Sequence, residues 1–338
     1  MTELAQLSRT AYQAQQIALR LSMAAAHAGL RLVMGRKRIP SAADLLALRR
    51  RLEELHARDL EHVERGDYPR ELLFQLPLRE YASHVPKLSA EVLRMLQRAK
   101  RGKVRDFPPQ IDLSRYPEYF RRNFHWQSDG YLSRRSAELY DFGVEFLFLG
   151  TGDVMRRQVI PPISQFLRES PGEKRILDVA CGTGRMLHQL ARAHPDHRYT
   201  GVDLSPFYVD RARELLSGRG VSLLVDNAEA LPLKEASFDV ALSVFLFHEL
   251  PRRARKNVLR EMRRVLDPSG LVVIEDAAQL TDAPELRVFL ENFSLEMNEP
   301  FFSGYLQEPL ETDLEEAGFR VESVEPAFLS KVVVARPV

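Results

Sequence analysis

The sequence has one cysteine, no long apolar run and almost no net charge, and each of these absences excludes something. Cys181 is the only cysteine among 338 residues, so no disulfide can form within the chain, and a reducing compartment, the cytoplasm, is expected. Residues 17–35 are the most apolar early segment, but Arg20, His27 and Arg31 interrupt the run of about 20 apolar residues that spanning a bilayer requires. The first residues also lack the basic segment and apolar core of a secretory signal.

The charge of the whole chain names no partner, because the formal net charge is only +1. Its distribution is uneven: residues 1–110 hold 20 Lys and Arg against 12 Asp and Glu, and the remainder holds 28 against 35. Basic clusters at residues 31–38 and 94–105 could contact anionic lipid headgroups or nucleic acid, or form solvated helix faces. They contain no aromatic residues, so nucleic acid is not favoured, whereas the apolar residues 23–34 favour peripheral association with a membrane.

Residues 1–110 are predicted to form a helical amino-terminal region. From Glu3 to about Gln97, strong helix formers carry apolar residues at three- and four-residue spacing, and Ser41 can cap one of the helices. A basic run followed by prolines and other turn residues then predicts a boundary near residues 100–115.

Residues 111–170 are predicted to form a helical cap, or lid, over the domain that follows. The segment is rich in aromatic residues and has a mostly helical pattern that ends at Pro161 and Pro162. It contains the stretch HWQSDGYLS, in which His125, Trp126 and Tyr131 could close over a ligand. Aromatic residues that simply fix the cap to the domain below would give the same pattern.

Residues 171–338 alternate short apolar runs with helical stretches, which is typical of βαβ units and a parallel sheet with helices on both faces. Two extended segments at the carboxyl end have only a short connection and predict an antiparallel hairpin at the sheet edge. The fold class is therefore α/β, a Rossmann-like, mostly parallel seven-stranded sheet. Its strands are expected near residues 176–180, 199–203, 222–226, 238–247, 271–277, 319–328 and 330–338. An insertion at about residues 280–310 is expected over the ligand crevice at the strand carboxyl ends.

The stretch RILDVACGTGR, residues 175–185, predicts a strand, a tight glycine turn and a helix. Asp203 ends the next predicted strand, where a carboxylate can accept hydrogen bonds from both hydroxyls of a ribose. This order suits NAD enzymes and S-adenosylmethionine enzymes alike. The dinucleotide fingerprint, however, requires Gly or Ala where this chain has Leu187, which argues against NAD. A tight turn without a ligand is the alternative for the glycines alone.

Several stretches together resemble the class I S-adenosylmethionine-dependent methyltransferases, and most closely their ubiquinone/menaquinone C-methyltransferase branch. They are LDVACGTG, GVDLSPFYVDRAR, DNAEALPLKEASFDVALSVFLFHEL and LREMRRVLDPSGLVVIED, with the weaker YDFGVEFLFLGTGDVMRR upstream. The chain departs from the family at Ala180, where many members have Gly, at Met155, where the branch tends to have Trp, and at residues 267–270, where members usually read Lys-Pro-Gly-Gly.

The resemblance implies a set of cofactor-binding residues for S-adenosylmethionine. No metal-binding residues are predicted. Asp178 would organise the loop, and Asp203 would hold the ribose. Leu204 would pack on the adenine, whose edge Asn227 and Ala228 would meet. The methionine part would lie close to Gly182, Thr183 and Gly184, and the floor near the sulfonium would consist of Val244 and Phe245. A solvated strand end for Asp203 and an ordinary turn for Asn227 are the alternatives.

Methyl transfer from a sulfonium is an in-line displacement, so holding the acceptor in line and excluding water can supply most of the catalysis. His248 and Glu249 follow the fourth predicted strand and could orient or deprotonate an acceptor, as could His125 and Tyr131 from the cap; packing roles are the alternative. The stretch EPFF at Glu299 to Phe302, with Tyr305, is expected to line the other wall. Cys181 is expected to pack rather than react.

The sequence thus predicts an S-adenosylmethionine-dependent methyltransferase that acts on a small, aromatic or lipid-like acceptor. C- or O-methylation is preferred, because the strand end FLFHEL lacks the Asn/Asp-Pro-Pro-Tyr/Phe turn that presents an amine in many N-methyltransferases. An RNA or protein methyltransferase and a non-catalytic interaction module are the alternatives. A homo-oligomer is possible.

Overall fold

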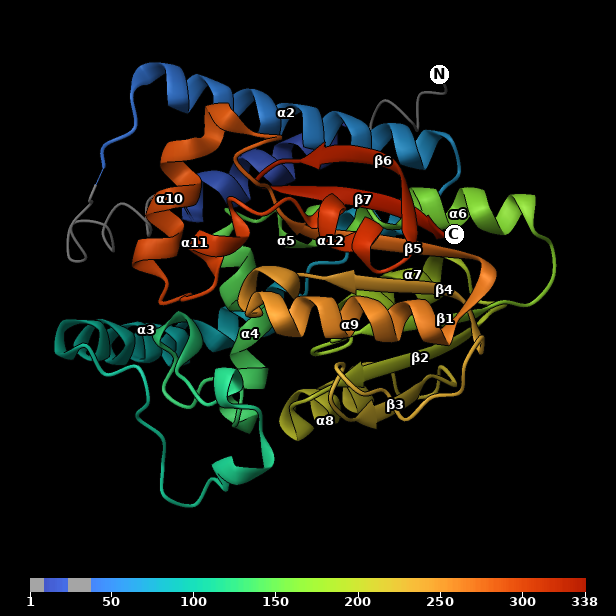
Figure 1. The fold of residues 1–338 in the computed structure, drawn as a ribbon. Coiled ribbons are helices and arrows are strands. Elements are labelled where there is room, and N and C mark those ends of the chain that lie inside the picture. The colour runs from blue at the N-terminus through green and yellow to red at the C-terminus, as the bar shows by residue number, and fades with distance from the viewer. Residues whose placement is uncertain (1–8, 24–37) are drawn as a thin grey trace.

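A seven-stranded sheet forms the centre of the molecule in the computed structural model, which describes residues 9–23 and 38–338. The strand order is β3-β2-β1-β4-β5-β7-β6 (Figure 1). The strands are β1 (Arg175–Val179), β2 (Arg198–Asp203), β3 (Ser222–Val225), β4 (Phe238–Val244), β5 (Leu266–Ala277), β6 (Phe319–Ala327) and β7 (Ser330–Pro337). Strands β1 to β5 pair in parallel, whereas β7 is antiparallel to both β5 and β6. The predicted α/β fold with an antiparallel edge pair is confirmed.

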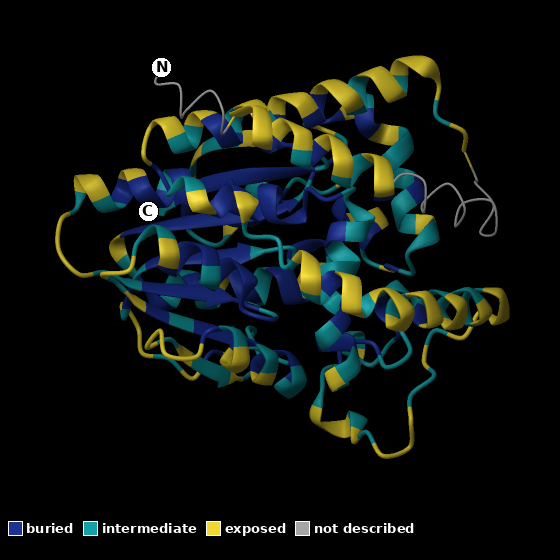
Figure 2. Cartoon of the chain, turned by 180° about the vertical axis from the view of Figure 1, so that it is seen from behind, coloured by how far each residue is buried: buried dark blue, intermediate teal, exposed yellow. Residues whose placement is uncertain are grey.

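Successive residues of the central strands enter two different cores, because side chains alternate across a sheet. In β1, Ile176 packs into the core on one face and Leu177 into the core on the other; Val240 and Ala241 divide in the same way in β4. Both faces are therefore covered by helices, and the sheet is buried (Figure 2).

The helices follow the βαβ pattern and add several elements before and after it. They are α2 (Ala42–Glu64), α3 (Leu78–Arg101), α4 (Arg134–Leu147), α5 (Gly152–Arg157), α6 (Ile160–Glu169), α7 (Arg185–Ala193), α8 (Pro206–Leu215), α9 (Arg252–Val265), α10 (Arg287–Glu296), α11 (Phe302–Tyr305) and α12 (Leu310–Glu316). Residues 9–23 are also helical. Helices α2, α6 and α7 contribute to the first core, and α9 and α12 to the second.

Helix α2 begins as the sequence predicts, with a capping box in which Ser41 and Asp44 bond each other's backbone N–H. Its Leu52 and Leu55 are buried in the same core as Ile176 of β1. The amino-terminal region therefore packs directly on the sheet.

The segment before α4 differs from the prediction of a mostly helical cap. Between Gly102, whose left-handed backbone (φ 61°) ends α3, and Arg134, the chain forms turns and short 3₁₀ helices. Prolines at 108, 109 and 117 lack the N–H that a continuous helix requires. The sequence predicts that a helix ends at Pro161 and Pro162. Instead, both residues lie in the first turn of α6, where proline is tolerated.

The end of β4 also differs from the prediction. The strand stops at Val244, and Phe245 has a left-handed backbone (φ 58°) that turns the chain into a 3₁₀ turn at Phe247–Glu249. The apolar residues 245–247 belong to this turn, although the sequence alone extends the strand through them.

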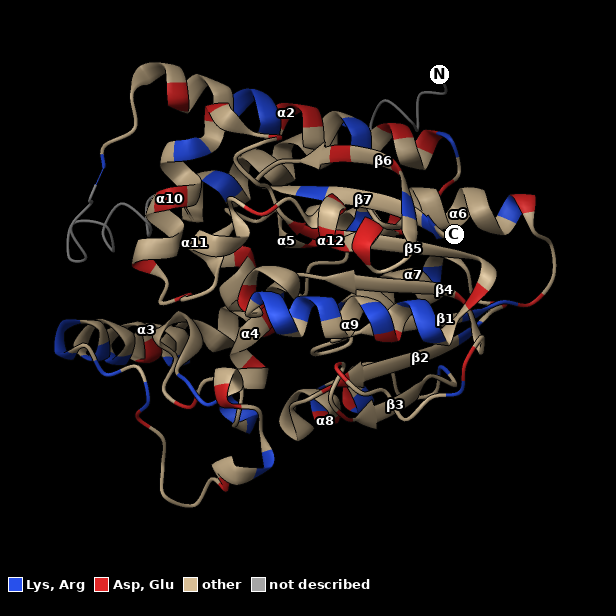
Figure 3. Cartoon of the chain, viewed as in Figure 1, with Lys and Arg blue, Asp and Glu red and all other residues tan. Residues whose placement is uncertain are grey.

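Basic residues lie on the outer side of α9 and at the carboxyl end of α3 (Figure 3). The cluster at 94–105 is thus partly on α3, whereas the predictions for residues 24–37, which include the apolar segment and most of the first basic cluster, lie outside the described residues. Within residues 9–23 and 38–338, no helix is long and apolar enough to cross a membrane.

Candidate functional site

The turn after β1 is built from left-handed backbone and close packing. Ala180, Gly182 and Gly184 have φ of 61°, 54° and 77°. A Cβ atom at Gly184 would lie 2.9 Å from Leu216 Cδ1 and 3.0 Å from Ala212 Cβ, so glycine lets α8 approach. At Gly182 the space is open: among the described residues, only Tyr208 comes within 4 Å of such an atom. Of the two glycines, Gly182 therefore leaves room for a ligand and Gly184 serves packing.

Asp203 at the end of β2 faces this turn. Its carboxylate accepts hydrogen bonds from the Gly182 N–H (2.9 Å) and the Ser205 N–H (2.8 Å). Burial raises the pKa of Asp203 to about 6, although both hydrogen bonds oppose the shift. Burial, and then the charge of Asp203, raise the pKa of Asp178 in β1 to about 8. Asp178 Oδ2 is buried with no hydrogen-bond partner among the described residues.

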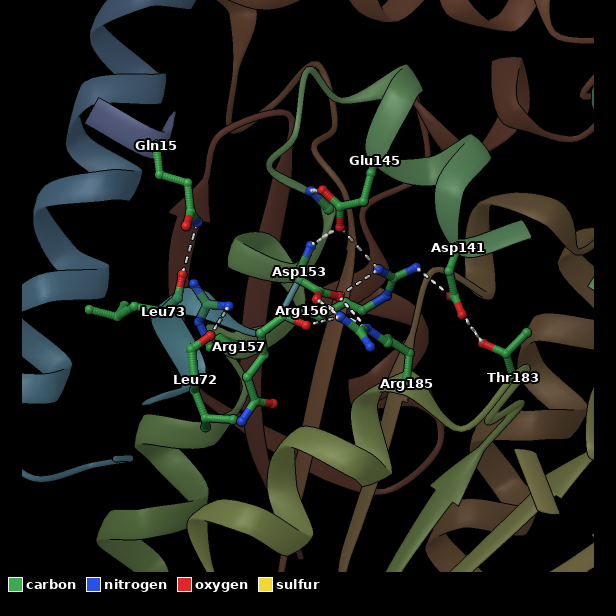
Figure 4. A network of polar contacts seen from close by, with 12 residues as sticks. Gln15, Leu72, Leu73, Asp141, Glu145, Asp153, Arg156, Arg157, Thr183 and Arg185 are labelled. Carbon is green, nitrogen blue, oxygen red and sulfur yellow. Dashed lines mark hydrogen bonds and ion pairs between the residues drawn. The ribbon is translucent and has the colours of Figure 1, made fainter. Parts of the chain in front are cut away.

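Thr183 is held by the cap rather than turned toward a ligand. Its hydroxyl donates to both carboxylate oxygens of Asp141 in α4 (3.0 Å each), and Asp141 faces Arg156 of α5 at 3.8 Å (Figure 4). Arg156 also lies over the ring of Phe245, 5.8 Å from its centroid. This network joins the glycine turn to the end of β4 through the cap.

The same network anchors α5 to the rest of the molecule. Asp153 accepts hydrogen bonds from Arg185, the first residue of α7 (Figure 4). Arg157 forms a buried ion pair with Asp59 of α2 (2.6 Å). Buried charges of this kind are costly unless paired, so the pairing fixes α5 in one position. The cap is therefore tied both to the glycine turn and to the amino-terminal region.

A cavity of about 100 Å³ lies at the carboxyl ends of β1 to β4. Seven of the predicted cofactor-binding residues line it, and so does Tyr131; the seven are Gly182, Asp203, Leu204, Asn227, Ala228, Val244 and Phe245. Among the described residues, the other three predicted cofactor-binding residues, Asp178, Thr183 and Gly184, do not line this cavity. We call this space the polar cavity.

Leu187 explains how the site departs from a dinucleotide fold. It is fully buried on α7, and a Cβ atom at Gly201 of β2 would lie 2.8 Å from Leu187 Cδ1 and 2.7 Å from Cys181 Sγ. The small residue that allows close packing between strand and helix is therefore Gly201 on β2, whereas the dinucleotide fingerprint places it on the helix. Cys181 is buried in this contact, which agrees with the predicted packing role, and burial raises the pKa of its thiol.

A second, larger cavity of about 280 Å³ lies between the cap, α3 and α10. We call it the apolar cavity, because aliphatic and aromatic side chains dominate its wall. They include Leu88, Met95, Leu139, Val144, Phe148, Phe289, Phe293 and Phe328. Tyr140, Phe245 and Glu249 line both cavities, so the two spaces meet at these side chains.

One end of the apolar cavity is polar. Glu249 Oε1 accepts hydrogen bonds from the Tyr131 hydroxyl and from His125 Nε2 (3.1 Å), and His248 Nδ1 lies 2.6 Å from Asp276 Oδ1. Burial alone would lower the pKa of His248, but Asp276 and then Glu299 outweigh it and raise the pKa to about 10. The structure thus brings together all three predicted catalytic candidates, His125, Tyr131 and His248.

The predicted second wall is wrong in detail. Glu299, Phe302 and Tyr305 are buried behind the polar end, with Glu299 Oε1 3.2 Å from His125 Nδ1, and the wall itself comes from α10. Residues of the insertion line the apolar cavity together with Phe245 and His248, which follow β4. Asp141 and Asp276 were not among the predicted site residues. For Asp276 the sequence did hold a signal that could have identified it, since it is a carboxylate near the end of the apolar run that forms β5.

The sequence comparisons agree with the geometry. A family described as methyltransferase domain matches residues 176–270. O-methyltransferase rstn1 of Aspergillus nomiae is 31% identical over 196 residues, which cover 54% of this chain and 84% of the relative. The chain therefore belongs to the class I S-adenosylmethionine-dependent methyltransferases, and its cofactor is S-adenosylmethionine.

Two further relatives differ in the acceptors that their names give. The fatty-acid O-methyltransferase of Mycolicibacterium smegmatis is 31% identical over 157 residues, 46% of this chain and 57% of the relative. The demethylmenaquinone methyltransferase of Thermotoga maritima is 35% identical over 140 residues, 41% of this chain and 57% of the relative. The chain thus matches little more than half the length of either protein.

Proposed function

We propose that this chain transfers a methyl group from S-adenosylmethionine to an oxygen or carbon atom of an elongated apolar or aromatic acceptor. The observation that carries the proposal is that the polar cavity and the apolar cavity meet at Tyr140, Phe245 and Glu249. Methyl transfer requires donor and acceptor to be held in line about 3 to 3.5 Å apart, which two adjoining cavities allow.

The polar cavity fits S-adenosylmethionine on its own chemistry. Asp203 offers an ionisable carboxylate for ribose hydroxyls, and the open space at Gly182 admits a ligand close to the backbone. Apolar groups for a flat base come from Leu204 and Ala228, which line the same space.

In this proposal the chain positions the cofactor and the acceptor and keeps water out of the site. Bound S-adenosylmethionine supplies an electrophilic methyl group on a sulfonium. Phe245 lies between the bound cofactor and the acceptor. Arg156 and the contact between Asp141 and Thr183 hold the surrounding elements in place, and the apolar wall excludes water. His125, Tyr131, His248 and Glu249 form the end where a polar group of the acceptor is oriented.

The acceptor class follows from the apolar cavity. A long wall of Leu, Met and Phe side chains binds hydrocarbon or aromatic rings, and hydrogen-bonding groups at one end orient a single polar group. A fatty acid and a demethylmenaquinone, the acceptors in the names of two relatives, both combine such a body with polar oxygen atoms. These relatives support lipid-like acceptors without choosing between C- and O-methylation.

Peripheral membrane association remains part of the proposal. Ile39, Leu45 and Leu46 are exposed beside Pro40 and Leu48, which line the apolar cavity. An apolar acceptor could thus enter from a bilayer surface. We expect the parent protein to co-sediment with anionic vesicles. The double variant Leu45→Ser/Leu46→Ser should lose this binding, and the control Leu21→Ser should keep it. Equal binding by the parent and both variants would contradict this route.

Calorimetry with S-adenosylmethionine and S-adenosylhomocysteine tests the central proposal. We expect one site for each ligand, and label transfer from methyl-labelled S-adenosylmethionine to long-chain fatty acids or demethylated quinones. Absence of heat with either ligand would make the chain a non-catalytic module. Transfer only to RNA or to a protein would replace the acceptor class.

A further inference from the structure

Three side chains from distant parts of the sequence converge at the polar end of the apolar cavity. His125 belongs to the cap, Glu249 follows β4, and Glu299 precedes α11. One nitrogen or oxygen atom of each lies within 4.8 Å of the others. This combination of an imidazole and two carboxylates is a ligand set for a divalent cation.

Glu299 lacks the hydrogen-bond donors that a buried carboxylate needs. Its side chain has 0% exposure, and among the described residues no donor forms a hydrogen bond to either of its oxygens. The nearest titratable groups are the rings of His125, with Nδ1 3.2 Å from Oε1, and of His248, with Nε2 3.7 Å from Oε2. Leaving an ionised carboxylate in this state costs several kcal/mol.

The other ring nitrogen of His125 is already engaged. Nε2 lies 3.1 Å from Glu249 Oε1, and a carboxylate can only accept, so the ring donates its Nε2–H. In the neutral ring, Nδ1 then presents its lone pair toward Glu299. The two atoms are close, but they are not aligned as a hydrogen bond, and neither has a hydrogen-bond partner among the described residues.

A cation between these two atoms would resolve the conflict. Ligands about 2.1 Å from a metal, at tetrahedral or octahedral angles, lie about 3.0 to 3.4 Å apart, and His125 Nδ1 and Glu299 Oε1 are separated by 3.2 Å. A metal-bound histidine typically donates its other N–H to a carboxylate, as His125 does to Glu249.

We propose that His125 Nδ1 and Glu299 bind a divalent first-row transition metal, with Zn²⁺ and Mn²⁺ as the ions that this mixed nitrogen and oxygen set suits, while Glu249 orients the His125 ring by accepting its Nε2–H. Because His125 lines the apolar cavity and its partner Glu249 lines both cavities, the ion would lie beside their junction, where an acceptor oxygen can become a further ligand. That last step rests on the proposed function; the binding of the metal does not.

Metal binding is tested directly by titrating ZnCl₂, MnCl₂ and MgCl₂ into EDTA-treated, dialysed full-length protein by calorimetry. We expect one equivalent of Zn²⁺ or Mn²⁺ to bind and Mg²⁺ to bind more weakly. Glu299→Gln keeps the shape but removes the charge, and we expect it to raise Kd at least tenfold. Glu291→Gln, on the same insertion but in an ion pair with Arg287, is the matched control and should bind as the parent does.

Co²⁺ absorption provides a second measurement, because a nitrogen ligand and the coordination number change its visible bands. Loss of the bands in His125→Gln and in Glu299→Gln would support the site. No stoichiometric binding of any ion, or equal Kd for Glu299→Gln and Glu291→Gln, would overturn it and leave His125 as an imidazolium between two carboxylates. If Glu299→Gln does not fold by circular dichroism, His125→Gln takes its place under the same criteria.

The metal inference and the proposed function fail separately. Metal-free protein that still binds S-adenosylmethionine keeps the function, whatever the metal titration shows. Protein that binds Zn²⁺ or Mn²⁺ but not S-adenosylmethionine keeps the metal site and loses the function.

Discussion

The two cavities of this protein are built in different ways. The polar cavity lies at the ends of four neighbouring strands, and its lining comes largely from turns next to those strands. The apolar cavity is assembled from side chains of the cap, α3, α10 and the turn after β4, which are far apart in the sequence. Substitutions on one side should therefore alter cofactor binding, and substitutions on the other should alter acceptor binding.

The largest effect is expected for Asp203→Ala. Loss of a carboxylate that accepts two hydroxyl hydrogen bonds should weaken S-adenosylmethionine binding by about 3 kcal/mol, which is more than 100-fold. Calorimetry measures the change in Kd. Asp210→Ala on the exposed side of α8 is the control and should bind as the parent does. Similar Kd values for both variants would remove Asp203 from the cofactor site.

Gly184→Val should destabilise the fold by about 2 kcal/mol or more, since a side chain there meets α8 and the left-handed backbone disfavours it. Chemical unfolding measures the free energy of unfolding. Gly218→Val has the same kind of backbone (φ 76°) but open space around it, and it separates the backbone contribution from the contact with α8. Equal losses in the two variants would mean that the contact with α8 contributes nothing.

Phe293→Ala should act on the acceptor alone. Removing this ring from the apolar wall is expected to raise the acceptor KM about tenfold, because burying a phenylalanine side chain contributes roughly 1.5 to 3 kcal/mol. The Kd for S-adenosylmethionine should stay the same. A variant that loses cofactor binding as well would show that the two cavities are not independent.

The last prediction concerns pH. The titratable side chains around Asp203 are Asp178, Glu249, Tyr140 and Tyr208, and its pKa is raised to about 6. Below that pH the free carboxyl becomes protonated and loses its charge. S-adenosylmethionine affinity should thus fall as the pH falls, about tenfold between pH 7 and pH 5. Asp203→Asn should flatten this dependence, and an unchanged profile would assign it to another group.

Most of the fold and the polar cavity could be predicted from the sequence. Strand and turn signals place Gly182, Asp203 and Asn227 at neighbouring strand ends, because parallel strands carry their carboxyl ends to one edge. The errors are local. Pro161 begins a helix that it was expected to end, and the left-handed Phe245 stops β4 within an apolar run that carries no turn signal.

The acceptor side could be predicted only in outline. His125, Tyr131 and His248 were expected near a ligand, but no spacing indicated that Glu299 would turn inward behind them or that α10 would supply the wall. The role of Asp141 was equally hidden, since its partner Thr183 lies 42 positions away.

The sequence by itself thus determined the sheet, the glycine turn and the family, because these depend on periodicity and on residues adjacent in the chain. Only the tertiary structure decided which side of the glycine turn is open, how the two cavities meet, and that His125, Glu249 and Glu299 face one another. The physical reason is that such contacts depend on how the cap and the insertion pack over the strand ends, and long-range packing leaves no periodic signal in a single sequence.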